Sequence, residues 1–329
     1  MRFGPVPLAE ALGGILAHRE ALTDGQLPKG HVLTEADITR LAASGLSEVT
    51  VARLDPGDVD ENDAAAMLAR ALVAEAPGLR LSVAATGRVN VIADDPGLAA
   101  LDVAALHGVN RIDPMITVAT VPDLHRMEAG GLVATIKIIA YAVPGAHLDA
   151  ACAAGAGAIA LHRPLIDRVA LIETRIGRDP GDKGMRALKA RLDRLGVGFA
   201  GRTMVDHDAQ ALAAALRSID APLVCILTGS ATSDLQDTAP QALRLAGGTV
   251  DHFGMPVDPG NLLFLGRLGD RPVVGLPGCA RSPALNGADW VLERLLCGLE
   301  VTPADICAMG VGGLLKEIPS RPRPRRAAD

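Results

Sequence analysis

The second half of the chain alternates short apolar runs with longer segments whose apolar residues recur at helical spacing. The runs at 169–174, 199–204 and 223–227 predict strands, and the segments at 185–195 and 206–217 predict helices. Because this order is βαβαβ, we expect a three-layer α/β fold, in which a doubly wound, mostly parallel sheet carries helices on both faces. Folds of this kind bind their ligands at the C-terminal ends of the strands.

The first half of the chain has a less regular pattern, which predicts a smaller α+β domain over residues 1–160. We expect helices at 8–17, 35–43 and 64–75, and strands at 48–52, 81–85 and 132–143. Thr34 followed by Asp37 is typical of a helix N-terminus. An Ala/Gly-rich segment at 146–160 precedes the second domain, which is expected over 161–315. The Pro/Arg-rich segment 316–329 is expected to be a disordered tail.

A polar turn and a lone lysine interrupt the apolar pattern of the first domain. The strand at 81–85 leads into Thr86-Gly87-Arg88-Val89-Asn90, where hydroxyl, guanidinium and amide groups surround a glycine. Such a turn either holds a carboxylate or phosphate or is an ordinary connection. Lys137, within the apolar run, either reaches solvent from an edge or points into a polar cavity. The roles of Arg88, Asn110 and Lys137 stay open at this point.

Composition excludes several classes of protein. A net charge of −6 argues against a nucleic-acid surface, and an aromatic content of 2% leaves few side chains for stacking bases. The 5 cysteines are an odd set without CxxC spacing, which favours reduced thiols and disfavours zinc. No apolar run approaches the roughly 20 residues of a membrane helix, and the N-terminus lacks a signal-peptide pattern. We therefore expect a cytoplasmic protein without a membrane or nucleic-acid partner.

The strongest candidate for a ligand site begins at the apolar strand 223–227. It leads into a Gly-bearing loop from Thr228, and Asp237 then opens a short helix that Gly247-Gly248 closes. A loop of this kind places free backbone N–H groups beside a helix N-terminus, where phosphate-like anions bind. The sequence therefore predicts an anion site at this strand end.

Two acidic loops are expected to lie near each other at this edge. Asp182 follows the strand at 169–174, and Asp234 and Asp237 follow the strand at 223–227. Carboxylates beside bound phosphate suit a magnesium ion that bridges phosphate oxygens. Alternatively, Asp237 is only a helix N-cap, with Pro240 in the first turn.

Four turns, in order, resemble the molybdopterin-binding domain of molybdenum-cofactor biosynthesis proteins of the MogA, MoeA and gephyrin type. The central one resembles the T-G-G-T-G…R-D-x-T-P-E-A stretch of that family and reads Thr228-Gly229-Ser230-Ala231-Thr232-Ser233-Asp234-Leu235-Gln236-Asp237-Thr238-Ala239-Pro240-Gln241-Ala242. The others are Asp182-Lys183-Gly184, Pro259-Gly260, and Gly275-Leu276-Pro277-Gly278 with Ser282. The resemblance spans about residues 165 to 300, and the segment 29–49 is similar to MoeA-like proteins more loosely.

The resemblance implies a molybdopterin-binding protein of cofactor biosynthesis. The implied reaction is Mg- and ATP-dependent adenylylation of molybdopterin, or molybdate insertion, with Asp182 and Asp237 as catalytic residues and magnesium ligands. The implied ligand contacts are Thr228, Gly229, Ser230, Asp234, Lys183, Gly184, Pro259, Gly260, Gly278 and Ser282. The alternative is a non-catalytic carrier or sensor that serves a separate nucleotidyltransferase or a molybdoenzyme. Related proteins are dimers or trimers, so a homo-oligomer is expected.

The chain departs from the family pattern at residues that would contact phosphate. Ser230 and Thr232 stand where adenylylating members have glycine, and Asp258 and Asn261 stand where MoeA-like members carry lysines. These changes weaken the attraction for an anion unless another cation, such as Lys183 or Arg281, takes over. The departures favour binding over catalysis.

Overall fold

The computed structural model of the protein describes residues 1–315 and divides into two compact units. The first unit holds residues 1–95 and 99–161, and the second holds residues 96–98 and those from 162 onward. The tail predicted at 316–329 lies outside the described residues. Within the described part of the chain, no helix combines the length and apolar composition needed to cross a membrane.

The N-terminal part of the first unit is a small antiparallel sheet with one helix. The sheet has the order β1-β5-β2, formed by Arg2–Pro7, Glu48–Arg53 and Ile15–Leu16, and a hairpin of β3 (Glu20–Leu22) and β4 (Gly25–Leu27) follows β2. Helix α1 (Glu35–Ala43) has the predicted bounds and buries Leu41. Its N-terminus is a capping box, in which Thr34 and Asp37 each bind the other's backbone N–H.

Residues 8–17 do not form the predicted helix. They form a short 3-10 turn (η1, Leu8–Glu10) and then strand β2. Gly13 adopts φ +74°, a left-handed conformation that ends a right-handed helix. The adjacent Gly14 packs against β5, because a Cβ there would lie 2.9 Å from Cβ of Val51. A close tertiary contact therefore overrides the helical spacing of the apolar residues.

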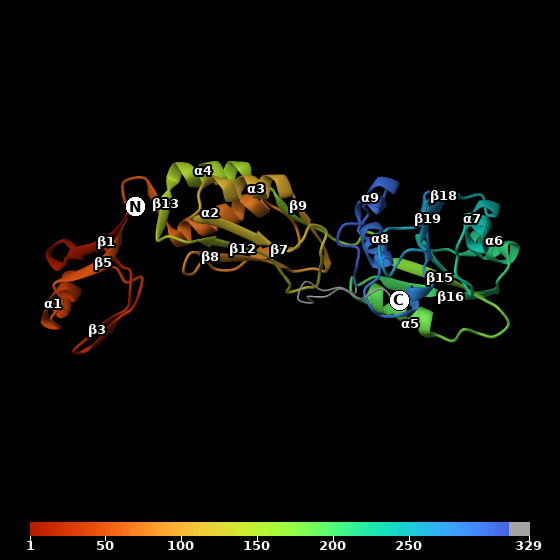
Figure 1. The fold of residues 1–329 in the computed structure, drawn as a ribbon, viewed down its shortest axis with the longest axis horizontal. Coiled ribbons are helices and arrows are strands. Elements are labelled where there is room, and N and C mark those ends of the chain that lie inside the picture. The colour runs from red at the N-terminus through yellow and green to blue at the C-terminus, as the bar shows by residue number, and fades with distance from the viewer. Residues whose placement is uncertain (316–329) are drawn as a thin grey trace, which may run out of the picture. The chain divides into compact units, whose positions relative to one another are not determined.

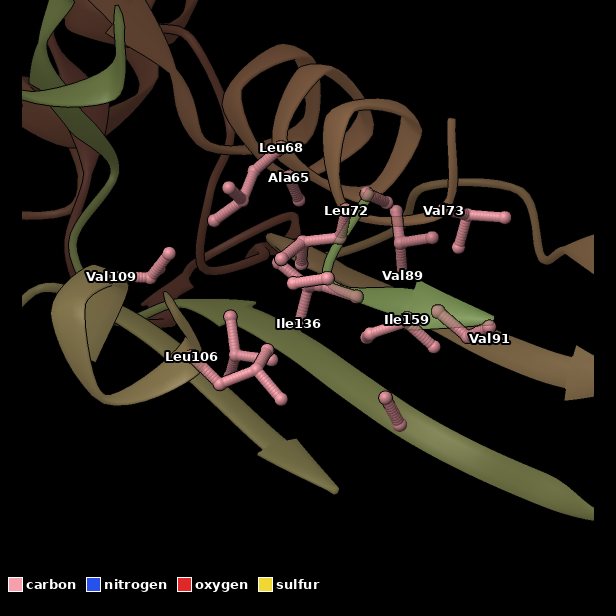
Figure 2. Packing of buried hydrophobic residues seen from close by; sticks show 14 of the residues in the cluster. Ala65, Leu68, Leu72, Val73, Val89, Val91, Leu106, Val109, Ile136 and Ile159 are labelled. Atoms are coloured by element: carbon pink, nitrogen blue, oxygen red, sulfur yellow. The ribbon is translucent and has the colours of Figure 1, made fainter. Parts of the chain in front are cut away.

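The rest of the first unit is a four-stranded antiparallel sheet covered by helices. The sheet has the order β10-β12-β8-β7, formed by Ile116–Thr120, Leu132–Ile138, Arg88–Ala93 and Leu79–Leu81. Helices α2 (Glu61–Val73), α3 (Val103–Ile112) and α4 (Gly145–Ala154) lie along one of its faces (Figure 1). Shorter sheets pair β6 (Asp58–Asp60) with β13 (Ala142–Pro144), and β11 (Arg126–Met127) with β9 (Gly97–Leu101) and β14 (Ile159–His162). Figure 2 shows Leu68 and Leu72 of α2 packed with Leu106 of α3 and Ile136 of β12.

The predicted strand at 81–85 is wrong in its bounds, because β7 ends at Leu81. Ala85 and Arg88 instead close a tight turn by exchanging backbone hydrogen bonds of 3.0 and 3.1 Å. Thr86 and Gly87 occupy the turn with φ of +50° and +68°. Asn62 Oδ1 accepts from the Gly87 N–H at 2.9 Å, so a residue of α2 fixes the turn.

The second unit is a three-layer α/β arrangement around a six-stranded sheet. The sheet has the order β16-β15-β17-β20-β19-β18, formed by Gly198–Asp206, Arg168–Arg175, Leu223–Leu227, Arg271–Leu276, Phe264–Leu268 and Thr249–Phe253. The first four strands are parallel, and β19 runs antiparallel to both neighbours, so the sheet is mostly parallel.

Alternating side chains of this sheet serve two cores. Leu171, Cys225 and Val274 pack with α5 (Lys183–Asp193) and α8 (Gly287–Leu296) on one face. Ile172 and Ile226 pack with α6 (Ala209–Ser218) and α7 (Thr238–Leu245) on the other. Two short helices, η2 (Gly278–Arg281) and α9 (Pro303–Ala308), complete the unit. Because both faces are covered, the C-terminal edge of the parallel strands remains for polar loops.

We predict that the capping box of α1 makes the stability of the first unit depend on acid pH. Hydrogen bonds from Thr34 and from His31, at 2.7 Å, lower the pKa of Asp37 from 3.8 to about 2. A carboxyl whose pKa falls on folding contributes stability above pH 3.8, and this contribution is lost as the pH falls toward 2. In urea unfolding of the full chain at several pH values, Asp37→Asn should lower the midpoint at pH 5 and lose this effect near pH 2. A constant difference between the proteins across this range would contradict the prediction.

Candidate functional site

Loops at one edge of the second unit's sheet contain the residues singled out in the sequence. The loops after β15, β17 and β20 leave the C-terminal ends of three adjacent parallel strands, so they share this edge. Strand β18 lies two antiparallel steps from β20 and therefore also ends here. The structure thus brings to one edge the loops that carry Asp182, Thr228, Pro259 and Gly278.

The loop after β17 is held largely by its own polar groups. Thr228 is buried, and its hydroxyl donates to the carbonyl of Ser230 at 2.6 Å and lies 3.2 Å from the hydroxyl of Thr232. The N–H of Gly229, expected to be free for an anion, instead donates to Thr174 Oγ1 at 2.8 Å. This correction removes one donor from the predicted phosphate cradle, while Ser230 remains exposed.

The two carboxylates of this loop also bind backbone groups. Asp237 is the N-cap of α7, and its two oxygens accept from Thr238 N at 2.7 Å and Ser233 N at 3.0 Å. Asp234 accepts from Gln236 N at 2.7 Å. Both side chains therefore stabilise the conformation of the loop. The contact of Asp237 with Thr238 N is that of a helix N-cap.

The neighbouring Asp-Lys-Gly turn places its three residues differently. Asp182 precedes α5 and forms an exposed ion pair with Arg186, 3.0 Å long. Lys183 is exposed at the start of the helix, whereas Gly184 is buried. A Cβ at Gly184 would lie 2.4 Å from Leu227 Cδ2 and 2.6 Å from Glu173 Oε1, so this glycine lets α5 approach β15 and β17 closely.

The two carboxylates predicted to hold magnesium are engaged with groups of the protein. Among residues 1–315, no three His, Cys, Asp or Glu side chains group as metal ligands. Both oxygens of Asp237 accept backbone N–H groups, and Asp182 is paired with an arginine. A magnesium site at Asp182 and Asp237 stays a prediction, because magnesium is usually held by one or two carboxylates together with phosphate oxygens and water.

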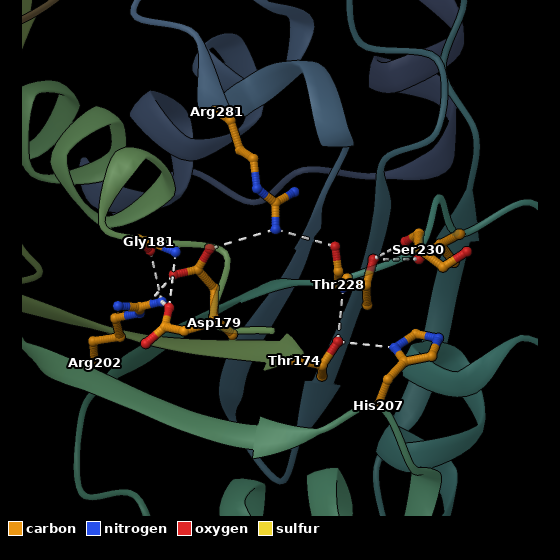
Figure 3. Close-up of polar contacts among 11 residues, drawn as sticks. Thr174, Asp179, Gly181, Arg202, His207, Thr228, Ser230 and Arg281 are labelled. Carbon is orange, nitrogen blue, oxygen red and sulfur yellow. Dashed lines mark hydrogen bonds and ion pairs between the residues drawn. The ribbon is translucent and has the colours of Figure 1, made fainter. Parts of the chain in front are cut away.

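A buried charge cluster, which sequence reasoning missed, lies at the same edge (Figure 3). Glu173 is fully buried at the end of β15, and its carboxylate lies 2.6 Å from Nε of Arg202 and 3.4 Å from Nη2 of Arg281. Arg202 also donates to the carbonyl of Gly181 at 2.8 Å, and Arg281 donates to that of Thr228 at 3.2 Å. Glu173 therefore connects the loops after β15, β17 and β20.

Burial of Glu173 makes its ionised form unfavourable in free energy. Burial raises the pKa of its carboxyl above the ordinary value, although the two guanidinium groups oppose this shift. A buried ion pair of this kind is weak evidence for stability, because the loss of hydration offsets the attraction. Its clear consequence is that Arg281 is held beside the loop after β17 and Arg202 beside the loop after β15. A single acidic residue near the end of an apolar strand was the signal that could have revealed it.

Thr174 links the same loop to strand β16. Its hydroxyl accepts from Gly229 N and lies 2.8 Å from Nδ1 of His207 (Figure 3). Thr174 is fully buried, whereas His207 is partly exposed. Gly229 is therefore held by Thr174 of β15, which in turn contacts His207, directly after β16.

Arg191 of α5 organises the loop after β20. Its guanidinium donates to the carbonyls of Ala280 at 2.9 Å, Ser282 at 2.9 Å and Ala284 at 3.2 Å. The same side chain pairs with the buried Asp289 of α8 at 2.5 Å. With a further bond to its own helix, all the donor nitrogens of this arginine have partners. Gly278 and Ser282 are thus carried on a segment that a buried arginine fixes.

The Pro259-Gly260 turn packs against the start of α8. The Pro259 carbonyl accepts from Gly287 N at 2.8 Å, and Gly260 has φ +151°. A Cβ at Gly260 would lie 3.0 Å from Gly287, so the turn has no room for a side chain. Asn261 donates to the carbonyl of Met255 at 3.3 Å. This glycine has a packing role in addition to any ligand contact.

Comparison with known proteins gives two findings. Residues 5–53 match a family model described as a domain of unknown function (DUF8806). The chain is also similar to the solved structure of a molybdopterin biosynthesis MoeA protein from Pyrococcus horikosii, with 17% sequence identity over 90% of this chain and 75% of that chain, and a TM-score of 0.32. No curated protein matches. A likeness at this TM-score assigns no residue and no activity.

Cations of the second unit that a ligand can reach lie at the C-terminal edge of the sheet. The guanidinium of Arg281 touches the Thr228 carbonyl, and 23% of this side chain is exposed, so a ligand can still reach it. Lys183 is exposed at the N-terminus of α5. Arg88 and Lys137 belong to the first unit. In the second unit, Arg281 is therefore the best candidate for an anion contact.

Proposed function

We propose that the second unit binds the phosphate group of molybdopterin and that the protein acts in molybdenum-cofactor biosynthesis. The observation that carries the proposal is the common position of four turns. They resemble the family in sequence, are far apart along the chain, and all leave one edge of the mostly parallel sheet. Parallel α/β sheets bind ligands at this edge, so the turns lie where a shared ligand would bind.

Arg281 supplies the charge that the proposal needs. A guanidinium donates two parallel hydrogen bonds to phosphate, and it keeps its charge at every physiological pH. The exposed Ser230 and the loop around Gly278 offer further polar contacts beside it. In this proposal Thr228 and Gly229 shape the loop, and Arg281 with Ser230 and Lys183 contacts the phosphate.

Binding is favoured over catalysis by the contacts of Asp237. The adenylylating reaction needs carboxylates that hold magnesium, and the N-cap contacts of Asp237 account for this residue without a catalytic role. We therefore place first the carrier that serves a separate nucleotidyltransferase or molybdoenzyme. Molybdopterin adenylylation or molybdate insertion by this chain, with Asp182 and Asp237 as its carboxylates, is the second candidate. A homo-oligomer remains a prediction.

Anaerobic binding measurements with molybdopterin test the proposal. Arg281→Met should weaken binding at least about tenfold, which corresponds to about 1.4 kcal/mol. Arg267→Met is the matched control, because this side chain is 62% exposed on β19 and should leave binding unchanged. Absence of molybdopterin binding, or equal affinities of the two variants, would contradict the proposed site.

ATP consumption separates the two candidates. A carrier should consume no ATP in the presence of molybdopterin and magnesium. Turnover that disappears in Asp237→Asn would instead establish the catalytic candidate, because asparagine is also a good N-cap and preserves the start of α7. Mass spectrometry of the molecules that co-purify with the protein would identify the bound form.

A further inference from the structure

A cleft in the first unit gathers charged side chains that the proposed function does not use. It has a volume of about 330 Å³ and is lined by Lys29, Gly30, Glu61, Thr86, Lys137, Ile139 and Tyr141. This volume is at the small end of the roughly 300–1,000 Å³ of ligand pockets. We call it the lysine cleft. It contains the polar turn and the lone lysine whose roles the sequence left open.

The turn at Thr86-Gly87 is built so that Lys137 and Glu61 meet beneath it. The ammonium of Lys137 donates to the Thr86 carbonyl and lies 3.9 Å from the carboxylate of Glu61. Gly87 has φ +68°, and a Cβ there would lie 2.7 Å from the backbone carbonyl oxygen of Ile138 and 2.8 Å from Glu61 Oε2, so the position favours glycine. The non-glycine Thr86 adopts φ +50°, a conformation that costs free energy and is held by its surroundings.

On the other side of the lysine cleft, hydrogen bonds hold Tyr141 in place. Tyr141 donates its hydroxyl to the carbonyl of Ala17 at 3.0 Å, and its own carbonyl accepts from Glu61 N at 3.0 Å. The ammonium of Lys29 lies over its ring, 5.5 Å from the ring centre. Within residues 1–315 no carboxylate pairs with Lys29. Lys29 therefore has no direct ion pair, and Glu61 of the same cleft attracts it only at longer range.

The charged groups of the lysine cleft determine which ligand charge it favours. Two ammonium groups and one carboxylate give the cleft a net charge of about +1. Arg88 lies directly opposite Lys137 on the neighbouring strand but does not line the cleft, so it is not counted. A monoanion neutralises this charge, whereas a phosphate dianion would also meet the carboxylate of Glu61. Ile139, with 54% exposure, and Tyr141 provide apolar surface beside the charges.

We propose that the lysine cleft binds a small organic carboxylate through the ammonium groups of Lys29 and Lys137, with the apolar body of the ligand against Ile139 and Tyr141. The cleft lies within the first unit and needs no residue of the second. The proposal therefore stands independently of molybdopterin binding.

The single tyrosine of the chain provides a specific reporter. The sequence contains 1 Tyr, so tyrosine labelled with ¹³C in its ring gives signals from Tyr141 alone. The full chain is titrated with benzoate as the probe, and with benzamide as its neutral analogue of the same shape. Benzoate should shift the Tyr141 signals to saturation, and benzamide should bind at least about tenfold more weakly, because it lacks the charge. A titration with inorganic phosphate completes the comparison.

Variants of the two lysines test the contacts. Lys29→Met and Lys137→Met should each weaken benzoate binding at least about tenfold. Lys189→Met, an exposed lysine of α5 in the second unit, should bind benzoate like the parent protein. If loss of the Thr86 contact unfolds Lys137→Met, Lys29→Met still decides the question, because Lys29 forms no ion pair in the described chain.

Four results would overturn the proposal. These are the absence of a saturable shift with benzoate, equal binding of benzamide and benzoate, tighter binding of inorganic phosphate than of benzoate, and unchanged benzoate affinity of Lys29→Met. The last result, with Lys137→Met lowering only the thermal midpoint, would assign Lys137 to the support of the Thr86-Gly87 turn alone.

Discussion

Replacement of Arg191 by methionine is expected to lower the free energy of unfolding of the second unit by about 3–5 kcal/mol. The side chain is buried, and its guanidinium pairs with Asp289, which is only 1% exposed. Methionine fills much of the volume but leaves Asp289 as a buried charge without its cation. The segment 280–284 would also lose the hydrogen bonds that fix it. Urea unfolding followed by the fluorescence of Trp290, the only tryptophan, measures the effect in this unit.

Two further variants show whether the buried charge is the cause. Arg194→Met, on the same helix end, removes only an exposed hydrogen bond of 3.3 Å to the Pro283 carbonyl and should cost less than about 1 kcal/mol. The double variant Arg191→Met/Asp289→Asn removes the unpaired charge and should be more stable than Arg191→Met alone. Equal stability of the single and double variants would show that the lost loop contacts, and not the charge, dominate.

Replacement of Gly184 by alanine is expected to destabilise the second unit by about 1–3 kcal/mol. Helix propensity alone predicts the opposite sign, because alanine is better than glycine in a helix by about 1 kcal/mol. The added methyl group, however, would lie 2.4 Å from Leu227 Cδ2 and 2.6 Å from Glu173 Oε1. Leu227 and Glu173 are both buried and have little room to move. The steric conflict therefore outweighs the propensity and displaces the first turn of α5, with Asp182 and Lys183.

Gly278→Ala is the matched control for this substitution. No atom lies within 4 Å of a Cβ at Gly278, and its backbone is not left-handed, so alanine fits without strain. Its thermal midpoint should equal that of the parent protein or exceed it slightly. A Gly184→Ala protein as stable as the parent in thermal unfolding would refute the close approach of α5 to β15 and β17.

The sequence predicted best those features that local interactions determine. The bounds of α1 and the N-cap of α7 depend on side chains such as Thr34 and Asp237, which bind backbone groups a few residues away. The order of strands and helices from β15 to β17 follows from hydrophobic periodicity, which is also local, whereas β18, β19 and β20 were not predicted. The helix predicted at 8–17 was wrong because Gly14 packs against Val51, a contact between distant positions that periodicity does not contain.

For the candidate site too, contacts between residues far apart in the sequence could not be predicted. Its loops could be named from the sequence, because strand ends in a parallel α/β fold share an edge. The cluster of Glu173, Arg202 and Arg281 could not, because these residues are separated along the chain and meet only through the strand order β16-β15-β17-β20. The engagement of the Gly229 N–H by Thr174 is likewise a contact between neighbouring strands.

Hydrogen bonds of its own side chains hold the loop after β17 in place. Thr228, Asp234 and Asp237 each bind backbone groups of the loop itself, and Gly229 is bound by Thr174. Binding of an anion here therefore does not have to immobilise a flexible segment, and the entropy lost on association is correspondingly small. If the proposed anion site is correct, its affinity is set by the cations at this edge, and an added lysine or arginine should increase affinity without redesign of the loop.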